Sequence, residues 1–147
     1  MDNRTLYLLT ALVLIAMAVL LGLNLTQILQ GTPATQNYLN PNEVRGVAVV
    51  HDNKNYTLNF QQQVDLIDKL NRSVKISDIP TEGTKQKPDF DKIVIYQFNN
   101  KPDISVTPVT YIDSNLIFKQ PEWNKEGYLM DTSAGLLQQT ITNSYDH

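Results

Sequence analysis

Three carboxylates are the first residues of this chain whose type and spacing could do chemistry. Glu82, Asp89 and Asp91 lie in one polar stretch between residues 77 and 91. Two neighbouring carboxylates can act as general acid and general base when one is held protonated and the other stays ionised. Three lysines lie among or next to them, however, which favours a solvated loop of mixed charge. A hydrolase that uses these carboxylates is therefore an alternative interpretation.

His51 is the only internal histidine, and it stands beside Asp52. A hydrolytic triad would need this pair next to a serine, and no Gly-x-Ser-x-Gly turn presents one. Because the chain has no cysteine, a zinc site would have to be completed by carboxylates. The run from Asp52 to Asn55 resembles a calcium loop only superficially, since Lys54 occupies a ligand position. We expect no catalytic residue, no metal ligand and no cofactor, and we interpret His51–Asn55 as a turn.

The only tryptophan of the chain is a candidate for partner contact. Trp123 lies in a polar turn, and Tyr128 follows it closely. Exposed aromatic side chains at such positions are often recognition anchors or interfacial membrane contacts. We therefore predict that Trp123 and Tyr128 contact a partner. The alternative is that Trp123 covers the edge of the core.

An uncharged segment near the amino terminus predicts a membrane anchor, which would hold these candidate residues beside a bilayer. Residues 6–25 are uncharged, and a helix of that length reaches about 30 Å, the thickness of the hydrocarbon core. Arg4 precedes the run, and the next positive charge is Arg45, which predicts a cytoplasmic amino terminus and an extracytoplasmic carboxy-terminal domain. A cleaved secretory signal is the alternative, and it would give a mature chain that starts near Thr35.

Small residues form a narrow stripe along the predicted anchor. Ala11, Ala18 and Gly22 are spaced seven and four apart, so they share one side of a helix. Such a stripe lets another helix approach closely, which makes these residues candidates for helix packing. Exposure of the same stripe to lipid is an equally good interpretation.

The sequence predicts four segments. They are a cytoplasmic tail (1–5), a single-pass transmembrane anchor (6–25), a linker (26–42) and an extracytoplasmic domain (43–147). The linker contains Gly and Pro and no charge before Glu43, which is typical of a tether. The formal net charge of −3 gives no excess of positive charge for phosphates, so we do not expect a nucleic-acid partner.

The residues after the linker predict an α+β fold. Residues 44–50 are mostly apolar and β-branched, as in a strand covered on both faces, and residues 56–60 alternate apolar and polar, which predicts a hairpin. Asn59 and Gln62 have the spacing of a capping box for a helix over 61–71, with Val64, Ile67 and Leu70 on its buried face. Further elements are predicted as strands at residues 93–98, 104–110, 116–118 and 128–130, and as a helix at 133–143 capped by Thr132 or Ser133.

These elements predict a mostly antiparallel sheet with two helices on one face, preceded by a single transmembrane helix. The leading functional hypothesis is a membrane-anchored, non-enzymatic accessory or binding module of a cell-envelope protein assembly. Its expected partners are the lipid bilayer and another membrane or envelope protein. Confinement to the membrane would raise the effective concentration of such a partner, so that a weak contact suffices.

Overall fold

The computed structural model describes residues 2–29 and 38–146, and within the first helix it describes side chains as far as residue 19. The chain divides into two compact units, Met1–Ala34 and Thr35–His147. Residues 30–37 of the predicted linker, and the predicted start of a cleaved chain near Thr35, lie outside the described residues.

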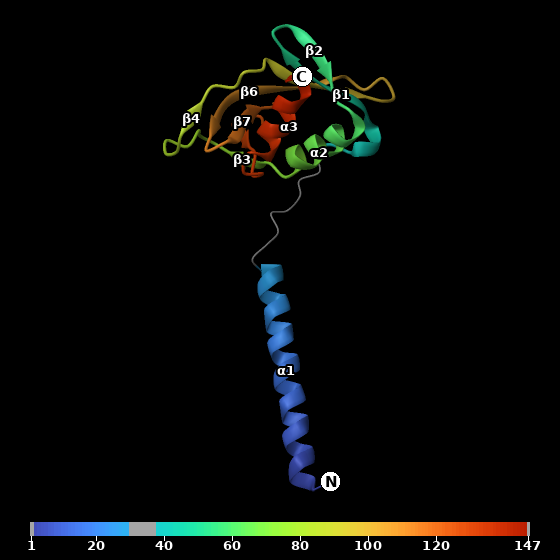
Figure 1. The fold of residues 1–147 in the computed structure, drawn as a ribbon, viewed down its shortest axis with the longest axis vertical. Helices are drawn as coiled ribbons and strands as arrows, with labels where there is room; N and C mark the ends of the chain where they lie inside the picture. Colours follow the sequence, from blue (N-terminus) through green and yellow to red (C-terminus); the bar gives the residue numbers. More distant parts are fainter. Residues whose placement is uncertain (1, 30–37, 147) are drawn as a thin grey trace. The chain divides into compact units, whose positions relative to one another are not determined.

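The first unit contains one long helix, α1 (Asn3–Leu29), drawn in blue in Figure 1. It is rich in Leu and Ala, which are strong helix formers. It begins inside the predicted tail and continues four residues beyond the predicted span. When the search is restricted to described residues, no helix is sufficiently long and apolar to cross a bilayer. The transmembrane helix predicted at residues 6–25 is therefore not supported by the structure.

The second unit is an α+β domain, which confirms the predicted fold class at this level. Its described strands form an eight-stranded antiparallel sheet in the order β2-β1-β5-β6-β7-β8-β3, with β4 paired to β6. The strands are β1 (Val44–His51), β2 (Lys54–Thr57), β3 (Val74–Ile76), β4 (Lys85–Gln86), β5 (Lys92–Gln97), β6 (Ile104–Ile112), β7 (Asn115–Lys119) and β8 (Tyr128–Met130). The helical elements are a short 3₁₀ turn, η1 (Pro41–Glu43), and the helices α2 (Phe60–Asn71) and α3 (Leu136–Tyr145).

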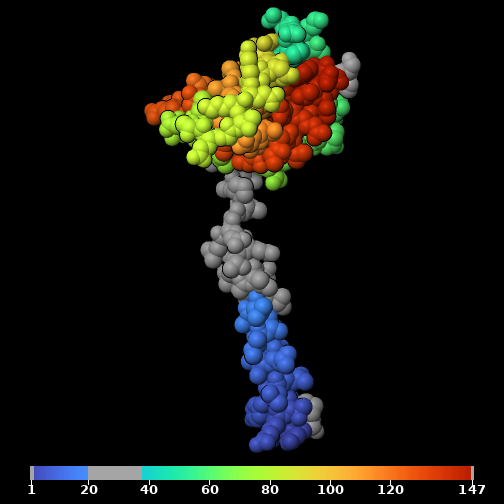
Figure 2. Space-filling view, turned by 60° about the vertical axis from the view of Figure 1, so that its left-hand side comes forward, coloured from blue at the N-terminus to red at the C-terminus, as the bar shows by residue number. Residues whose placement is uncertain are grey.

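Two tight hairpins fix the register of the sheet. In the β1–β2 hairpin, His51 pairs with Lys54, and both residues between them have positive φ angles, 50° at Asp52 and 62° at Asn53. Asp and Asn tolerate this left-handed conformation, which two-residue hairpin turns require. The β6–β7 hairpin is built the same way on Asp113 and Ser114. The hairpin predicted after the first strand is thus confirmed, and it protrudes from the domain (Figures 1 and 2).

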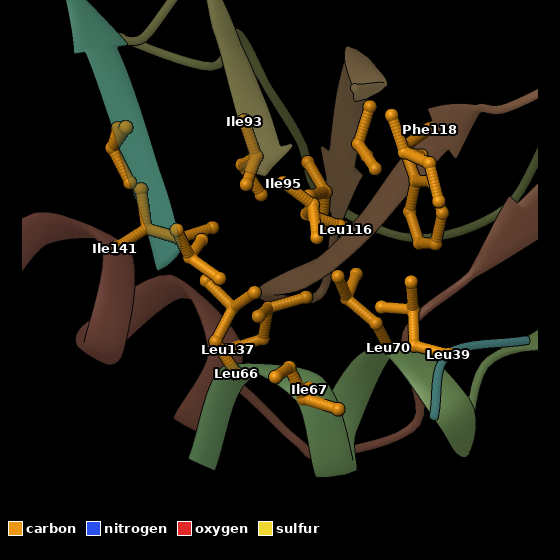
Figure 3. Close-up of a cluster of buried hydrophobic side chains, with 14 of the residues drawn as sticks. Leu39, Leu66, Ile67, Leu70, Ile93, Ile95, Leu116, Phe118, Leu137 and Ile141 are labelled. Atoms are coloured by element: carbon orange, nitrogen blue, oxygen red, sulfur yellow. The ribbon is translucent and has the colours of Figure 1, made fainter. Parts of the chain in front are cut away.

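Both domain helices pack on the same face of the sheet, as predicted. Figure 3 shows the side chains of α2 and α3 directed at those of the strands. The buried core residues on the helices are Leu66, Ile67, Leu70, Leu137 and Ile141, and they face Ile93, Ile95, Leu116 and Phe118 of the sheet. Burying a large aliphatic side chain stabilises a fold by about 1.5–3 kcal/mol, so this layer dominates the stability of the domain.

The sequence pattern misplaced several shorter elements. The predicted strand over residues 56–60 ends at Thr57, because Asn59 already caps α2. The last helix begins at Leu136 instead of Ser133, since Ala134 and Gly135 have left-handed φ angles of 53° and 90°. The N-cap is therefore Gly135 and neither Thr132 nor Ser133, although the Ser133 Oγ accepts a hydrogen bond from the Leu137 amide at 2.9 Å. The strands β3 and β4 were not predicted.

Candidate partner-binding surface

The helix α2 is built on a capping box and presents two different sides. The Gln62 amide donates to Asn59 Oδ1 at 2.9 Å, and the Asn59 amide donates to Gln62 Oε1 at 3.0 Å, which confirms the predicted cap. At the edge of its buried face, Phe60 is 79% exposed and Val64 is 41% exposed. These two residues are one helical turn apart, so they form one apolar strip that faces solvent.

A short segment of the chain, Leu39 to Pro41, lies alongside α2, and we call it the arm. Asn71 of α2 holds it by two hydrogen bonds. The Asn71 side chain accepts a hydrogen bond from the Leu39 amide at 2.9 Å and donates one to the Leu39 carbonyl, also at 2.9 Å. Both Asn71 and Leu39 are buried, and Leu39 belongs to the core. The domain therefore begins before residue 43, because the end of the predicted linker is part of its interior.

The arm and the helix enclose a groove of about 540 Å³, which we call the α2 groove. It is lined by Leu39, Asn40, Pro41, Val64, Ile67, Asp68 and Asn71. Asp68 is charged, and it already forms an ion pair with Arg72 at 3.0 Å. The side-chain oxygen and nitrogen of Asn71 are both hydrogen-bonded to the backbone of Leu39. An apolar side chain is therefore the best match for the α2 groove.

Trp123, predicted to contact a partner, lies in the core. Its ring stacks on Tyr38 with centroids 5.0 Å apart and meets the edge of Phe118 at 6.5 Å. Only 8% of its surface is exposed. The alternative, that Trp123 covers the edge of the core, describes this position.

Tyr128 lies at the surface, away from Trp123. Its neighbour along β8, Leu129, is buried in the core, so alternation along the strand directs Tyr128 to the opposite face of the sheet. There the Lys119 ammonium stands 4.9 Å from the centre of its ring, and both residues line a hollow of about 250 Å³. The structure thus does not bring the two predicted contact residues together.

The loop carboxylates hold different neighbours in place. Asp89 accepts a hydrogen bond from the Tyr145 hydroxyl at 2.7 Å, whereas Asp91 accepts one from the Asn53 amide at 3.2 Å. Glu82 is exposed. Two of the three candidate carboxylates therefore fasten the loop to the β1–β2 turn and to α3, which lies beside the loop in Figure 2.

His51 takes part in the same contact with α3. Its ring stacks on Tyr145 with centroids 4.3 Å apart, and its Nδ1 bonds to the Asp89 carbonyl. Burial, and then the hydrogen bond to Asp89, raises the pKa of Tyr145 above its ordinary value. Tyr145 therefore remains a neutral hydrogen-bond donor at physiological pH. Its contacts with His51 and Asp89 attach the end of α3 to the remainder of the domain.

Comparison with known proteins gives no match. No family model, no curated protein and no solved structure matches the chain. Inference about function therefore depends on the geometry of the surfaces described above.

The remaining predicted residues lie on α1. Ala11 and Ala18 are exposed, and Gly22 lies in the part of α1 for which burial is not described. Within the described part of the chain, no group of three or more His, Asp or Glu side chains is arranged to hold a metal ion.

Sequence reasoning missed the exposed strip of α2. The sequence pattern predicts Phe60 in a strand and Val64 on the buried face of the helix. The available signal was an excess of apolar residues, because α2 has five of them, at positions 60, 64, 66, 67 and 70, and they span more of the helix than one buried stripe.

Proposed function

We propose that this protein is a membrane-anchored, non-enzymatic binding module, in which the α2 groove and its apolar strip capture another membrane or envelope protein. The observation that carries this proposal is the 79% exposure of Phe60 beside an apolar groove of about 540 Å³. Buried aromatic side chains that fill such hollows supply much of the energy of protein interfaces.

The exposed strip is costly unless it is covered. A Phe side chain left in water forgoes about 1.5–3 kcal/mol that burial would return. Val64 extends the strip and also lines the α2 groove, so the strip and the hollow form one continuous surface. Contiguous apolar surface of this kind marks sites of protein association.

The anchoring part of the proposal is supported by the first unit. The residues from Leu6 to Leu25 carry no charge, and large apolar side chains described on α1 are exposed, among them Leu8 at 70% and Leu12 at 71%. A helix that is apolar on every side needs an apolar environment, which lipid provides. Arg4 supports an orientation with the amino terminus in the cytoplasm and the domain outside.

Two fractionation measurements test the anchor. We expect the full chain to stay with membranes during alkaline carbonate extraction, and we expect protease added to spheroplasts to degrade its carboxy-terminal domain. Release of the full-length chain by carbonate would refute the anchor. Protection of the domain from the protease would refute the orientation.

Site-specific photo-cross-linking in native cells tests the binding surface. A photoreactive amino acid at position 60 should yield a dominant protein adduct, whereas the same probe at Thr107 should not. Thr107 is an exposed residue of β6 next to the core residue Val106, so it faces away from the helices. Equal labelling from both positions, or adducts with lipid alone at position 60, would contradict the proposed binding surface.

A further inference from the structure

We propose that the occupant of the α2 groove is the α2 helix of a second copy of this chain, so that two copies form a two-fold symmetric dimer. This inference rests on the proposed role of the α2 groove as a binding surface and names its partner.

The helix presents a projection and a hollow side by side. Phe60 projects from the first turn, and the α2 groove lies further along, where Ile67 and Asn71 line it. Phe60 and Ile67 are seven positions apart, which corresponds to roughly 10 Å along the helix axis. Val64 lies between the two and belongs to both the strip and the groove lining.

This arrangement is self-complementary. If two α2 helices pack antiparallel with the two-fold axis near Val64, each Phe60 lies over the groove of the other copy. A two-fold interface requires that one surface carry both the projecting group and the site that receives it. A second copy supplies both parts, since its groove receives Phe60 and its Phe60 fills the groove.

The charges along α2 permit this pairing. Residues 60–64 carry no charge, and the charged residues of the helix begin at Asp65. Antiparallel packing therefore sets the uncharged half of one helix against the charged half of the other. In that half, Asp68 is paired with Arg72 at 3.0 Å, so it adds no unpaired charge opposite Phe60.

Membrane attachment would favour the same assembly. Two chains anchored in one bilayer meet at a raised effective concentration, so that a modest interface is sufficient. A two-fold axis along the membrane normal would leave both anchors directed toward the same bilayer.

The absence of cysteine allows a direct test by single-cysteine cross-linking of the full chain in its native membrane. Val64→Cys should form a disulfide-linked dimer under mild oxidation, because the two-fold axis brings the two side chains together. Ser105→Cys is the matched control, since Ser105 is exposed on β6 and faces away from the helices. It should give no dimer above background.

A second variant tests the role of the projecting ring. Phe60→Asp in the Val64→Cys chain should abolish the cross-link, whereas Thr107→Asp should leave it unchanged. Because Phe60 is 79% exposed, the domain should fold in both variants, as circular dichroism can verify.

The possible results separate the two proposals. If Val64→Cys cross-links no more than Ser105→Cys, the dimer is refuted. A photo-adduct from position 60 with a different protein would also refute the dimer, yet it would leave the binding module standing. Adducts with lipid alone would refute both. A photo-adduct with a second copy, lost on Val64→Asp, would support both.

Discussion

The turn between β7 and β8 and the first turn of α2 each present one large aromatic residue in a polar stretch, and the structure treats them in opposite ways. Trp123 is 8% exposed, whereas Phe60 is 79% exposed. The difference comes from neighbours distant in sequence, because Tyr38 and Phe118 enclose Trp123. Among the residues that the structure describes, none encloses Phe60 in this way. An aromatic residue in a polar segment thus indicates a contact surface only when the remainder of the fold leaves it uncovered.

This contrast separates stability from binding. Changes near Trp123 should weaken the folded domain, and changes at Phe60 should leave it intact while abolishing association.

Trp123→Ala should lower the free energy of unfolding by about 3–5 kcal/mol, because it removes a buried ring and leaves a cavity against Tyr38 and Phe118. Urea unfolding of the full chain in a mild detergent, followed by circular dichroism, measures the loss. Trp123→Phe should recover a large part of it. A loss below about 1 kcal/mol, the range of surface substitutions, would contradict the interior position of Trp123.

Asn71→Ala should cost about 2–4 kcal/mol, because the amide and carbonyl of Leu39 would both lose their partner in a buried position. The same variant should also loosen the wall of the α2 groove, which Leu39 and Asn71 line, and so weaken binding of a partner there. Asn40→Ala is the control: Asn40 is exposed and accepts one hydrogen bond, from the Asn42 amide, so its loss should cost about 1 kcal/mol. Equal losses for the two variants would contradict the role of Asn71 as a clamp.

Asp131 directly follows β8, and it is fully buried. Burial raises the pKa of its carboxyl above the ordinary value of 3.8, although hydrogen bonds from Ser133 and the charge of Lys69 on α2 act in the opposite sense. The folded state therefore holds this proton more tightly than the unfolded state. The stability that this group contributes is fully present below its ordinary pKa and is lost as pH rises through the folded-state pKa.

Asp131→Asn should remove this pH dependence, since an amide does not titrate in this range. The stability of the variant relative to the unmodified protein should therefore be lower at pH 3 than at pH 7. Unfolding by urea at both pH values, monitored by the fluorescence of Trp123, gives the difference between the two proteins. A difference that does not change with pH would show that the Asp131 proton is bound equally in both states.

The sequence signals that predicted the fold correctly are local ones. The apolar strands β1 and β5 to β8, and the Asn59–Gln62 cap, depend on residues close together in the chain. The α2 groove and the burial of Trp123 depend on contacts across long separations. Asn71 binds Leu39, 32 residues earlier, and Tyr38 packs on Trp123. The periodicity of apolar residues in the sequence does not reveal such contacts. For this reason the sequence predicts a contact surface at Trp123, which is in fact buried.

The very short strands escaped prediction for a related reason. β4 has two residues, Lys85 and Gln86, and both are exposed, so they show no alternation of apolar and polar side chains. Their strand conformation comes from pairing with Tyr111 and Ile112 of β6. Elements that are stabilised wholly by a partner strand leave little trace in their own sequence.

Phe60→Ser should have the smallest effect on folding and the clearest effect on association. An exposed side chain contributes little to the free energy of unfolding, so we expect a change within about 0.5 kcal/mol in urea. The same substitution removes the group that the α2 groove would receive, so the position-64 cysteine cross-link should disappear. Loss of stability by several kcal/mol would show that Phe60 is covered in solution, and the contrast with Trp123 would fail. Unchanged stability together with lost association would establish that Phe60 serves binding, whereas Trp123 serves folding.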